Sequence, residues 1–153
     1  MSVHDKLIEL GIILPTPAQA VANYVPIVIA NGFVIVSGQL PLEHGQVAIT
    51  GKLGQDVALD AGVRAARLCF INVLAQLDAH LPGGLGAVAR VVRLGGFIAA
   101  TPFFTDHAKV MNGASDLAVA VFGEAGRHAR STIGVASLPL DAAVEVEGMV
   151  QLA

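Results

Sequence analysis

An arginine and two glutamates near the C-terminal end have residue types and spacing that could support chemistry. Arg130 directly precedes the run Ser131 to Ser137, which reads as a strand. The planar fork of an arginine at this position can hold a carboxylate through two parallel hydrogen bonds. An interface salt bridge or a solvated strand end would use the same residue, and position alone favours those structural alternatives.

The glutamates, Glu145 and Glu147, lie two residues apart in a second predicted strand. Alternation places both on one face of that strand, whereas Val144, Val146 and Val150 project from the other. On an open face both carboxylates would simply be solvated, which position alone favours. On a face covered by neighbouring subunits each needs a partner, and one could orient a water molecule as a base.

Other kinds of site find no support in the sequence. Five histidines show no metal-ligand spacing, and the lone Cys69 lies in a helical apolar pattern that indicates a buried structural thiol. The glycines of residues 83–86 end a helix instead of opening one around a phosphate. No nucleotide-binding loop and no serine-hydrolase elbow is present.

The composition predicts a single domain, residues 1–153, that associates with copies of itself. Hydrophobic residues make up 54% of the chain and charged residues 14%, against about 25% charged residues in ordinary globular proteins. No apolar run approaches the roughly 20 residues of a membrane-spanning helix, and the polar N-terminus lacks the pattern of a secretory signal. We therefore expect a cytoplasmic homo-oligomer, and the net charge of −3 argues against nucleic acid as a partner.

The hydrophobic periodicity predicts an α+β fold with one mixed sheet and two helices packed on one of its faces. The pair Asn31-Gly32 predicts a tight hairpin, Pro26 an edge strand, Gly95-Gly96 a bulge and Thr105 a helix N-cap. The expected helices span residues 3–10, 55–78 and about 106–122, and the expected strands span residues 25–30, 33–37, 46–49, 87–100, 131–137 and 144–150.

Several segments, in this order, resemble the reactive intermediate deaminase (Rid) family, which is also known as YjgF-type or endoribonuclease L-PSP. The resemblance covers about residues 24–152 and leaves residues 1–20 as an N-terminal extension. The segments are Tyr24-Val25-Pro26, Phe33 to Pro41 with its Ser-Gly-Gln, Asn112, Ala129-Arg130-Ser131, and Leu138 to Glu147 with its Val-Glu-Val-Glu.

The resemblance implies a chorismate-mutase-like fold assembled as a homotrimer, with sites between subunits that would cover the glutamate face. It implies the hydrolysis of enamine and imine intermediates of small carboxylates, such as 2-aminoacrylate, to 2-oxo acids and ammonia, without a metal or cofactor. By position, Arg130 matches the arginine that grips the substrate carboxylate, and Glu145 matches the glutamate that orients the attacking water. The matching substrate-binding positions are Tyr24, Ser37, Gly38, Asn112 and Thr132.

The sequence also departs from the family pattern and indicates a divergent branch. Thr132 stands where deaminating members often have cysteine, the second long helix lacks the usual tyrosine, and the segment from Gly95 to Phe104 is longer. Two other functions therefore stay open. One is a non-catalytic module that binds small carboxylates or regulates a partner enzyme. The other is a ribonuclease or translation inhibitor, for which the few basic residues give little support.

Overall fold

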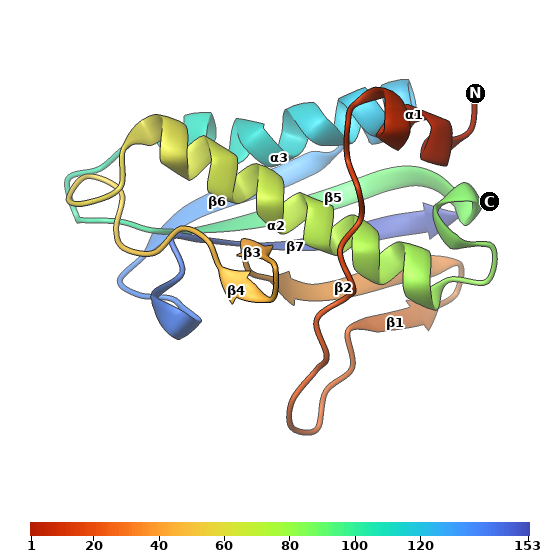
Figure 1. The fold of residues 1–153 in the computed structure, drawn as a ribbon, viewed down its shortest axis with the longest axis horizontal. Coiled ribbons are helices and arrows are strands. Elements are labelled where there is room, and N and C mark those ends of the chain that lie inside the picture. Colours follow the sequence, from red (N-terminus) through yellow and green to blue (C-terminus); the bar gives the residue numbers. More distant parts are fainter.

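A five-stranded mixed sheet forms the centre of the fold in the computed structural model, which describes all 153 residues (Figure 1). The strand order is β1-β2-β7-β5-β6, with β5 and β6 parallel and the other neighbours antiparallel. A two-stranded ribbon, β3-β4, lies apart from it. The strands are β1 (Ile27–Ala30), β2 (Phe33–Gln39), β3 (Leu42–Glu43), β4 (Gln46–Val47), β5 (Val88–Ala99), β6 (Ala129–Val135) and β7 (Val144–Leu152).

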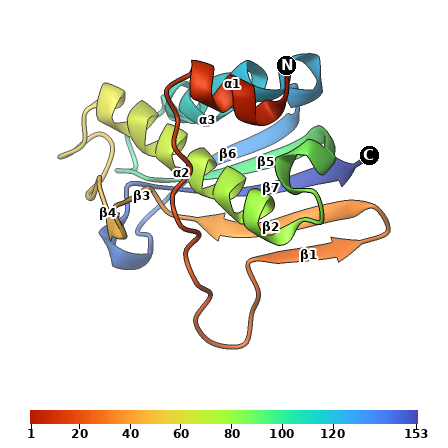
Figure 2. The same ribbon diagram turned by 45° about the vertical axis from the view of Figure 1, so that its right-hand side comes forward.

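Two long helices, α2 (Leu59–His80) and α3 (His107–Phe122), pack on one face of this sheet, as predicted (Figures 1 and 2). Val34 and Val36 of β2 and Val144, Val146 and Val150 of β7 are buried beneath them. The structure therefore confirms the expected α+β architecture. No helix combines the length and the apolar character that crossing a membrane requires.

The opposite face of the sheet has no covering layer within one chain. Ile35 of β2 and Ile133 of β6 belong to this open face, and their exposed fractions are 50% and 52%. Such side chains are normally buried. The open face of the sheet therefore leaves large apolar side chains accessible within one chain.

The hairpin between β1 and β2 forms as the sequence predicts. Asn31 and Gly32 have φ angles of 52° and 80°, the positive values that a type I′ turn requires at both central positions. The first strand begins at Ile27, later than expected, because Pro26 has no N–H to donate. The Pro26 carbonyl still accepts a hydrogen bond from the Ser37 N–H, at 2.9 Å.

The bulge expected at Gly95-Gly96 is wrong. Strand β5 pairs with β7 in regular register from Arg93 to Ile98, and the register shifts lie earlier, between Val88 and Arg93. The two glycines instead make room for neighbouring side chains. A Cβ at Gly95 would collide with the side chain of Glu147, and one at Gly96 would collide with Met111 of α3.

Both long helices begin differently from the prediction. Helix α2 begins at Leu59 instead of residue 55, because residues 51–57 form a turn in which Asp56 accepts a hydrogen bond from the Lys52 N–H. Helix α3 begins at His107, and its N-cap is Asp106, whose side chain makes no capping hydrogen bond. The predicted cap Thr105 therefore lies outside the helix.

Cys69 of α2 is buried as expected, and its thiol donates to the Val144 carbonyl of β7 at 3.4 Å. Burial raises the pKa of this thiol well above its ordinary value, with a further contribution from the negative charge of Glu145. The thiol therefore stays protonated and unreactive in the folded protein.

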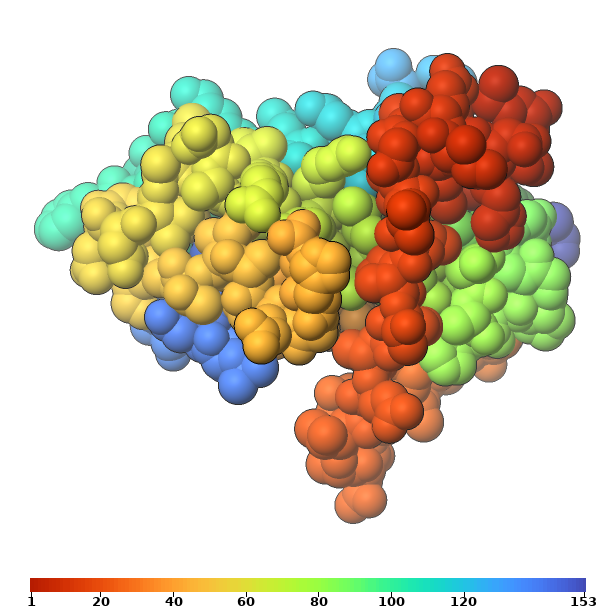
Figure 3. All heavy atoms as spheres, in the orientation of Figure 1, coloured from red at the N-terminus to blue at the C-terminus, as the bar shows by residue number.

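The N-terminal segment packs across the helix layer. Helix α1 (Val3–Glu9) lies beside α3, and the chain then crosses α2 on its way to β1 (Figures 1 and 3). Leu7 and Ile12 are buried, and Gln76 of α2 donates to the Ala18 carbonyl at 2.8 Å. These contacts make residues 1–20 part of the packed structure.

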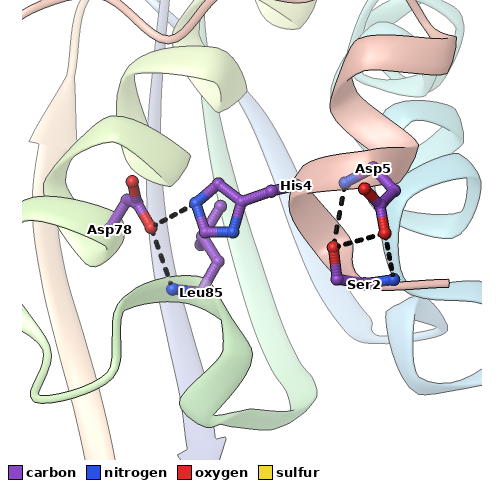
Figure 4. A network of polar contacts seen from close by, with 5 residues as sticks. All are labelled: Ser2, His4, Asp5, Asp78 and Leu85. Atoms are coloured by element: carbon purple, nitrogen blue, oxygen red, sulfur yellow. Dashed lines mark hydrogen bonds and ion pairs between the residues drawn. The ribbon is translucent and has the colours of Figure 1, made fainter.

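The carboxylate of Asp78, near the end of α2, contacts both α1 and the turn that follows α2. Its Oδ1 atom lies 2.9 Å from His4 Nε2 and accepts a hydrogen bond from the Leu85 N–H at 3.1 Å (Figure 4). Helix α1 is itself capped by Ser2 and Asp5, which exchange hydrogen bonds (Figure 4). Asp78 thus fixes α1 and the turn at Leu85 to α2 through one oxygen.

We expect Asp78→Ala to lower the free energy of unfolding by about 1–3 kcal/mol, because the Leu85 N–H loses its acceptor. Asp78→Asn keeps an acceptor oxygen and should cost less. His4→Ala removes only the exposed contact and should cost least. Urea unfolding at one protein concentration measures all three, and equal losses in Asp78→Ala and His4→Ala would contradict this role of the carboxylate.

Candidate functional site

Arg130 lies in β6, and its side chain is on the side of the sheet that faces α3, because it donates hydrogen bonds to that helix. Its Nη1 atom donates to Asn112 Oδ1 at 2.9 Å and to Ser115 Oγ at 3.1 Å, and its Nη2 atom donates to the Ala108 carbonyl at 3.3 Å. The structure therefore brings together two of the predicted site residues, Arg130 and Asn112.

All three hydrogen-bond acceptors around the guanidinium are neutral. None of the six ion pairs in the chain includes Arg130, so no carboxylate of its own chain pairs with it. Three of its five N–H groups are used by α3. Nε has no acceptor within the chain, and Nη2 has one acceptor for its two hydrogens, so both of these neighbouring nitrogens keep a donor. A carboxylate can bind two neighbouring nitrogens of a guanidinium through parallel hydrogen bonds.

Thr132 follows Arg130 by two residues and projects from the same face of β6. Its hydroxyl is buried and has no hydrogen-bond partner within the chain. A buried hydroxyl without a partner is costly in a native fold. This hydroxyl lies on the same face of β6 as the arginine, toward the helix layer.

A second group of predicted residues lies at the start of the hairpin. Ser37 Oγ donates to the Val25 carbonyl at 2.7 Å and so fastens the segment that carries Tyr24. The Tyr24 side chain is 54% exposed. Ser37 therefore positions Tyr24, which is free to contact a ligand or another subunit.

Glu145 lies on the open face of β7, near Gly38. A Cβ at Gly38 would collide with the Glu145 carboxylate in its present position. Burial raises the pKa of Glu145 above its ordinary value, and the negative charge of Glu147 adds to this effect. Glu147 lies on the same face but has a cation, because Arg93 Nη1 is 3.7 Å from its Oε1. The predicted alternation is confirmed, and the two glutamates differ in their surroundings.

The structure separates Arg130 and Glu145 onto opposite faces of the sheet. Arg130 is in register with Leu94, which is buried under the helices. Glu145 is in register with Phe97, which pairs in turn with Ile133 on the open face. Since the sheet lies between them, one chain does not bring both side chains to one small ligand.

Sequence reasoning missed three partners of this site. Ser115 and the Ala108 carbonyl hold the arginine, and His128 contacts Ser115, with 2.9 Å between His128 Nε2 and Ser115 Oγ. Helical spacing could have found Ser115, three residues after Asn112 and on the same face of α3. His128 precedes Arg130 by two residues, which is the spacing of one strand face.

Two clefts lie elsewhere on the chain. One, of about 650 Å³, separates α1 from the end of α3 and includes Lys6 and Phe122. The other, of about 620 Å³, lies at the end of β6 and includes Lys52, Thr101 and His107. Neither is lined by Arg130 or Glu145. Nowhere do three histidine, cysteine, aspartate or glutamate side chains converge as metal ligands.

This chain is thus a small α+β protein, in which helices cover one face of a mixed sheet and polar side chains lie on β6 and β7. The chain belongs to the YjgF/chorismate-mutase-like family, described as putative endoribonucleases, which it matches over residues 4–152. This match confirms the resemblance in the sequence.

Individual proteins are similar to this chain over nearly its whole length. Protein TCP17 of Trypanosoma cruzi is 47% identical over 151 residues, which cover 98% of this chain and 94% of TCP17. The crystal structure of Atu1372 from Agrobacterium tumefaciens is 46% identical with a TM-score of 0.90, covering 98% of this chain and 91% of that one. A putative endoribonuclease from Shewanella oneidensis is 34% identical with a TM-score of 0.96, covering 99% and 100%.

A more distant relative shares the fold. Escherichia coli TdcF, whose crystal structure contains bound serine, is 24% identical with a TM-score of 0.66, and the match covers 90% of this chain and 94% of TdcF.

The raised pKa of Glu145 predicts a gain in stability when its charge is removed. A carboxyl whose pKa is higher in the folded state than its ordinary value of 4.5 destabilises the fold once it ionises. This cost is absent below the ordinary pKa and complete above the raised one. Glu145→Gln should therefore have a higher Tm than wild type at pH 7, and the difference should vanish as the pH falls below 4.5.

Thermal unfolding at one protein concentration measures this difference. Glu147→Gln is the matched control: it removes an ion pair with Arg93 and should bring no such gain. A Glu145→Gln protein that is less stable than wild type at pH 7 would show that the carboxylate has a stabilising partner.

Proposed function

We propose that the protein hydrolyses reactive enamine and imine intermediates of small carboxylates to 2-oxo acids and ammonia. The observation that carries the proposal is the guanidinium of Arg130, which is held by neutral acceptors and keeps one edge free. Such an edge suits a carboxylate. The serine in TdcF, which also has a carboxylate, agrees with a small ligand of this class in the family.

The proposal includes a homotrimer with composite sites. The exposed Ile35 and Ile133 support burial of the open face against neighbouring subunits. Arg130 and Glu145 lie on opposite faces of one sheet, so a shared ligand requires the arginine of one subunit and the glutamate of its neighbour. Tyr24, Ser37 and Gly38 lie on the glutamate side of this arrangement, and Asn112 and Thr132 on the arginine side.

The chemistry requires positioning more than activation. An enamine first takes a proton at C3 and releases one from its nitrogen, and so becomes the imine, whose C2 is already electrophilic. Water held by Glu145 adds its oxygen to C2, and its proton passes through the carboxylate to the nitrogen. The carbinolamine then collapses: its hydroxyl proton passes to the nitrogen, the C–N bond breaks, ammonia leaves with that electron pair, and the C=O bond forms. A carboxylate with a raised pKa is a better base near neutral pH, and fixing the substrate carboxylate supplies orientation.

The first test is the release of pyruvate from 2-aminoacrylate generated in situ. Wild-type protein should accelerate it, and Arg130→Ala should lower the acceleration by roughly 100-fold, since charge-assisted hydrogen bonds contribute about 1.5–3 kcal/mol each. Arg127→Ala is the control, because Arg127 is exposed and pairs with Glu124. No acceleration by wild type with several amino-acid-derived imines would refute the deaminase function.

A binding module without catalysis is the second candidate, and the neutral surroundings of Arg130 favour it equally. It predicts that 2-oxo acids bind and that Arg130→Ala abolishes binding, without turnover. Glu145→Gln separates the two candidates in the same assay. A deaminase should lose turnover in this variant and still bind pyruvate, which calorimetry can measure.

The composite site predicts complementation between inactive variants. Subunits carrying Arg130→Ala and subunits carrying Glu145→Gln, co-expressed in equal amounts, should form trimers in which some sites combine an intact arginine with an intact glutamate. Random assembly would restore about one quarter of the sites. Each variant expressed alone is the control, and mixed trimers as inactive as those controls would place both residues in a site within one chain.

A further inference from the structure

A chain of three hydrogen-bonded groups extends from Arg130 into the protein. Arg130 Nη1 donates to Ser115 Oγ at 3.1 Å, Ser115 Oγ lies 2.9 Å from His128 Nε2, and His128 Nδ1 lies 2.7 Å from the Gly126 carbonyl oxygen. Ser115 belongs to α3, and His128 precedes β6. The chain therefore links the helix to the strand behind the arginine.

The protons in this chain have one consistent arrangement. A carbonyl oxygen only accepts, so the hydrogen of a neutral His128 ring must be on Nδ1, facing Gly126. Nε2 is then an acceptor and takes the hydroxyl hydrogen of Ser115. The Ser115 oxygen in turn accepts the N–H of Arg130. Each hydrogen bond thus orients the next, from the backbone carbonyl to the guanidinium.

The hydrogen-bond chain ends at the Gly126 carbonyl, which the packing holds in a fixed position. Gly126 is buried against α3, where a Cβ would collide with the Ala118 carbonyl, so no other residue fits. The carbonyl that orients His128 is thus held by the packing of η2 (Gly123–Gly126) on α3. A fixed acceptor at this point gives the imidazole one orientation.

We propose that His128 is a positioning residue that acts through Ser115 to hold Arg130 with its Nε and Nη2 edge free. Asn112 and Ser115 both accept hydrogen bonds from Nη1. If Ser115 loses the acceptor that orients its hydroxyl, the guanidinium can turn about its side-chain bonds and present another edge. The inference rests on the proposed function only in assigning a carboxylate ligand to that edge.

The tautomer of His128 tests the chain without any ligand or activity. Long-range ¹H–¹⁵N correlation spectra of the whole protein at neutral pH distinguish a ring protonated at Nδ1 from one protonated at Nε2. We expect His128 to carry its hydrogen on Nδ1, and this signature should persist in Arg130→Ala. A His128 ring protonated at Nε2, or at both nitrogens, would overturn the proposal.

Ligand affinity tests the effect on Arg130, with pyruvate as the probe in calorimetry. His128→Leu removes both ring nitrogens, and Ser115→Ala removes the link. Each should weaken binding roughly threefold to tenfold, the usual effect of losing one neutral hydrogen bond. His128→Gln is the conservative variant, because its amide oxygen can reach the Ser115 hydroxyl, and it should bind pyruvate as wild type does. In turnover, the loss in His128→Leu should appear in KM, with kcat little changed.

Double substitution separates positioning from general stability. Adding His128→Leu to Ser115→Ala should weaken binding no further than Ser115→Ala alone, since the histidine acts only through the serine. Additive losses, or a His128→Gln protein as weak as His128→Leu, would overturn the proposal. If wild type neither binds pyruvate nor releases it from 2-aminoacrylate, the proposed function fails. The role of the hydrogen bonds from Gly126 to Arg130 is then tested by the tautomer of His128 and by the ¹⁵N signals of the Arg130 side chain. These signals should change in His128→Leu but not in His128→Gln.

Discussion

Because α2 and α3 cover one face of the sheet only, alternate residues of each strand meet two different environments. On β7 the valines of one face build the core, and the glutamates of the other face remain half-buried. On β6 the alternation sends Arg130 toward α3 and Ile133 toward the open side. The separation of the two charged groups and the exposed apolar surface both follow from this one-sided cover.

The charged groups then differ in how the chain compensates them. Arg130 is held by an amide, a hydroxyl and a carbonyl, and Glu145 by no opposite charge, whereas Glu147 has Arg93. Folding alone would favour pairing such charges, since an unpaired, half-buried charge lowers stability. Within one chain, Arg130 therefore has no anionic partner and Glu145 has no cationic one. An anionic ligand would compensate the charge of the arginine, and an ordered water molecule would donate a hydrogen bond to the glutamate.

Much of the fold could be predicted from local pattern. Alternation in β7 and the Asn31-Gly32 turn depend on neighbours in sequence, and they were right. The bulge at Gly95-Gly96 was wrong because glycine there serves side chains from α3 and β7, which no local pattern reveals. For the site, the family resemblance pointed to Arg130 and Asn112. It did not point to Ser115 and His128, whose contacts with each other and with the arginine depend on how α3 packs beside β6.

The lone thiol gives the molecule an internal reporter. Cys69 sits between α2 and β7 and becomes reactive only when these elements part, because burial keeps it protonated. A thiol reagent that reacts with the open state faster than the interface closes would therefore modify the chain at the rate at which this interface opens. Since Cys69 contacts the carbonyl of Val144, directly before Glu145, that rate measures the motion of the backbone that carries the carboxylate.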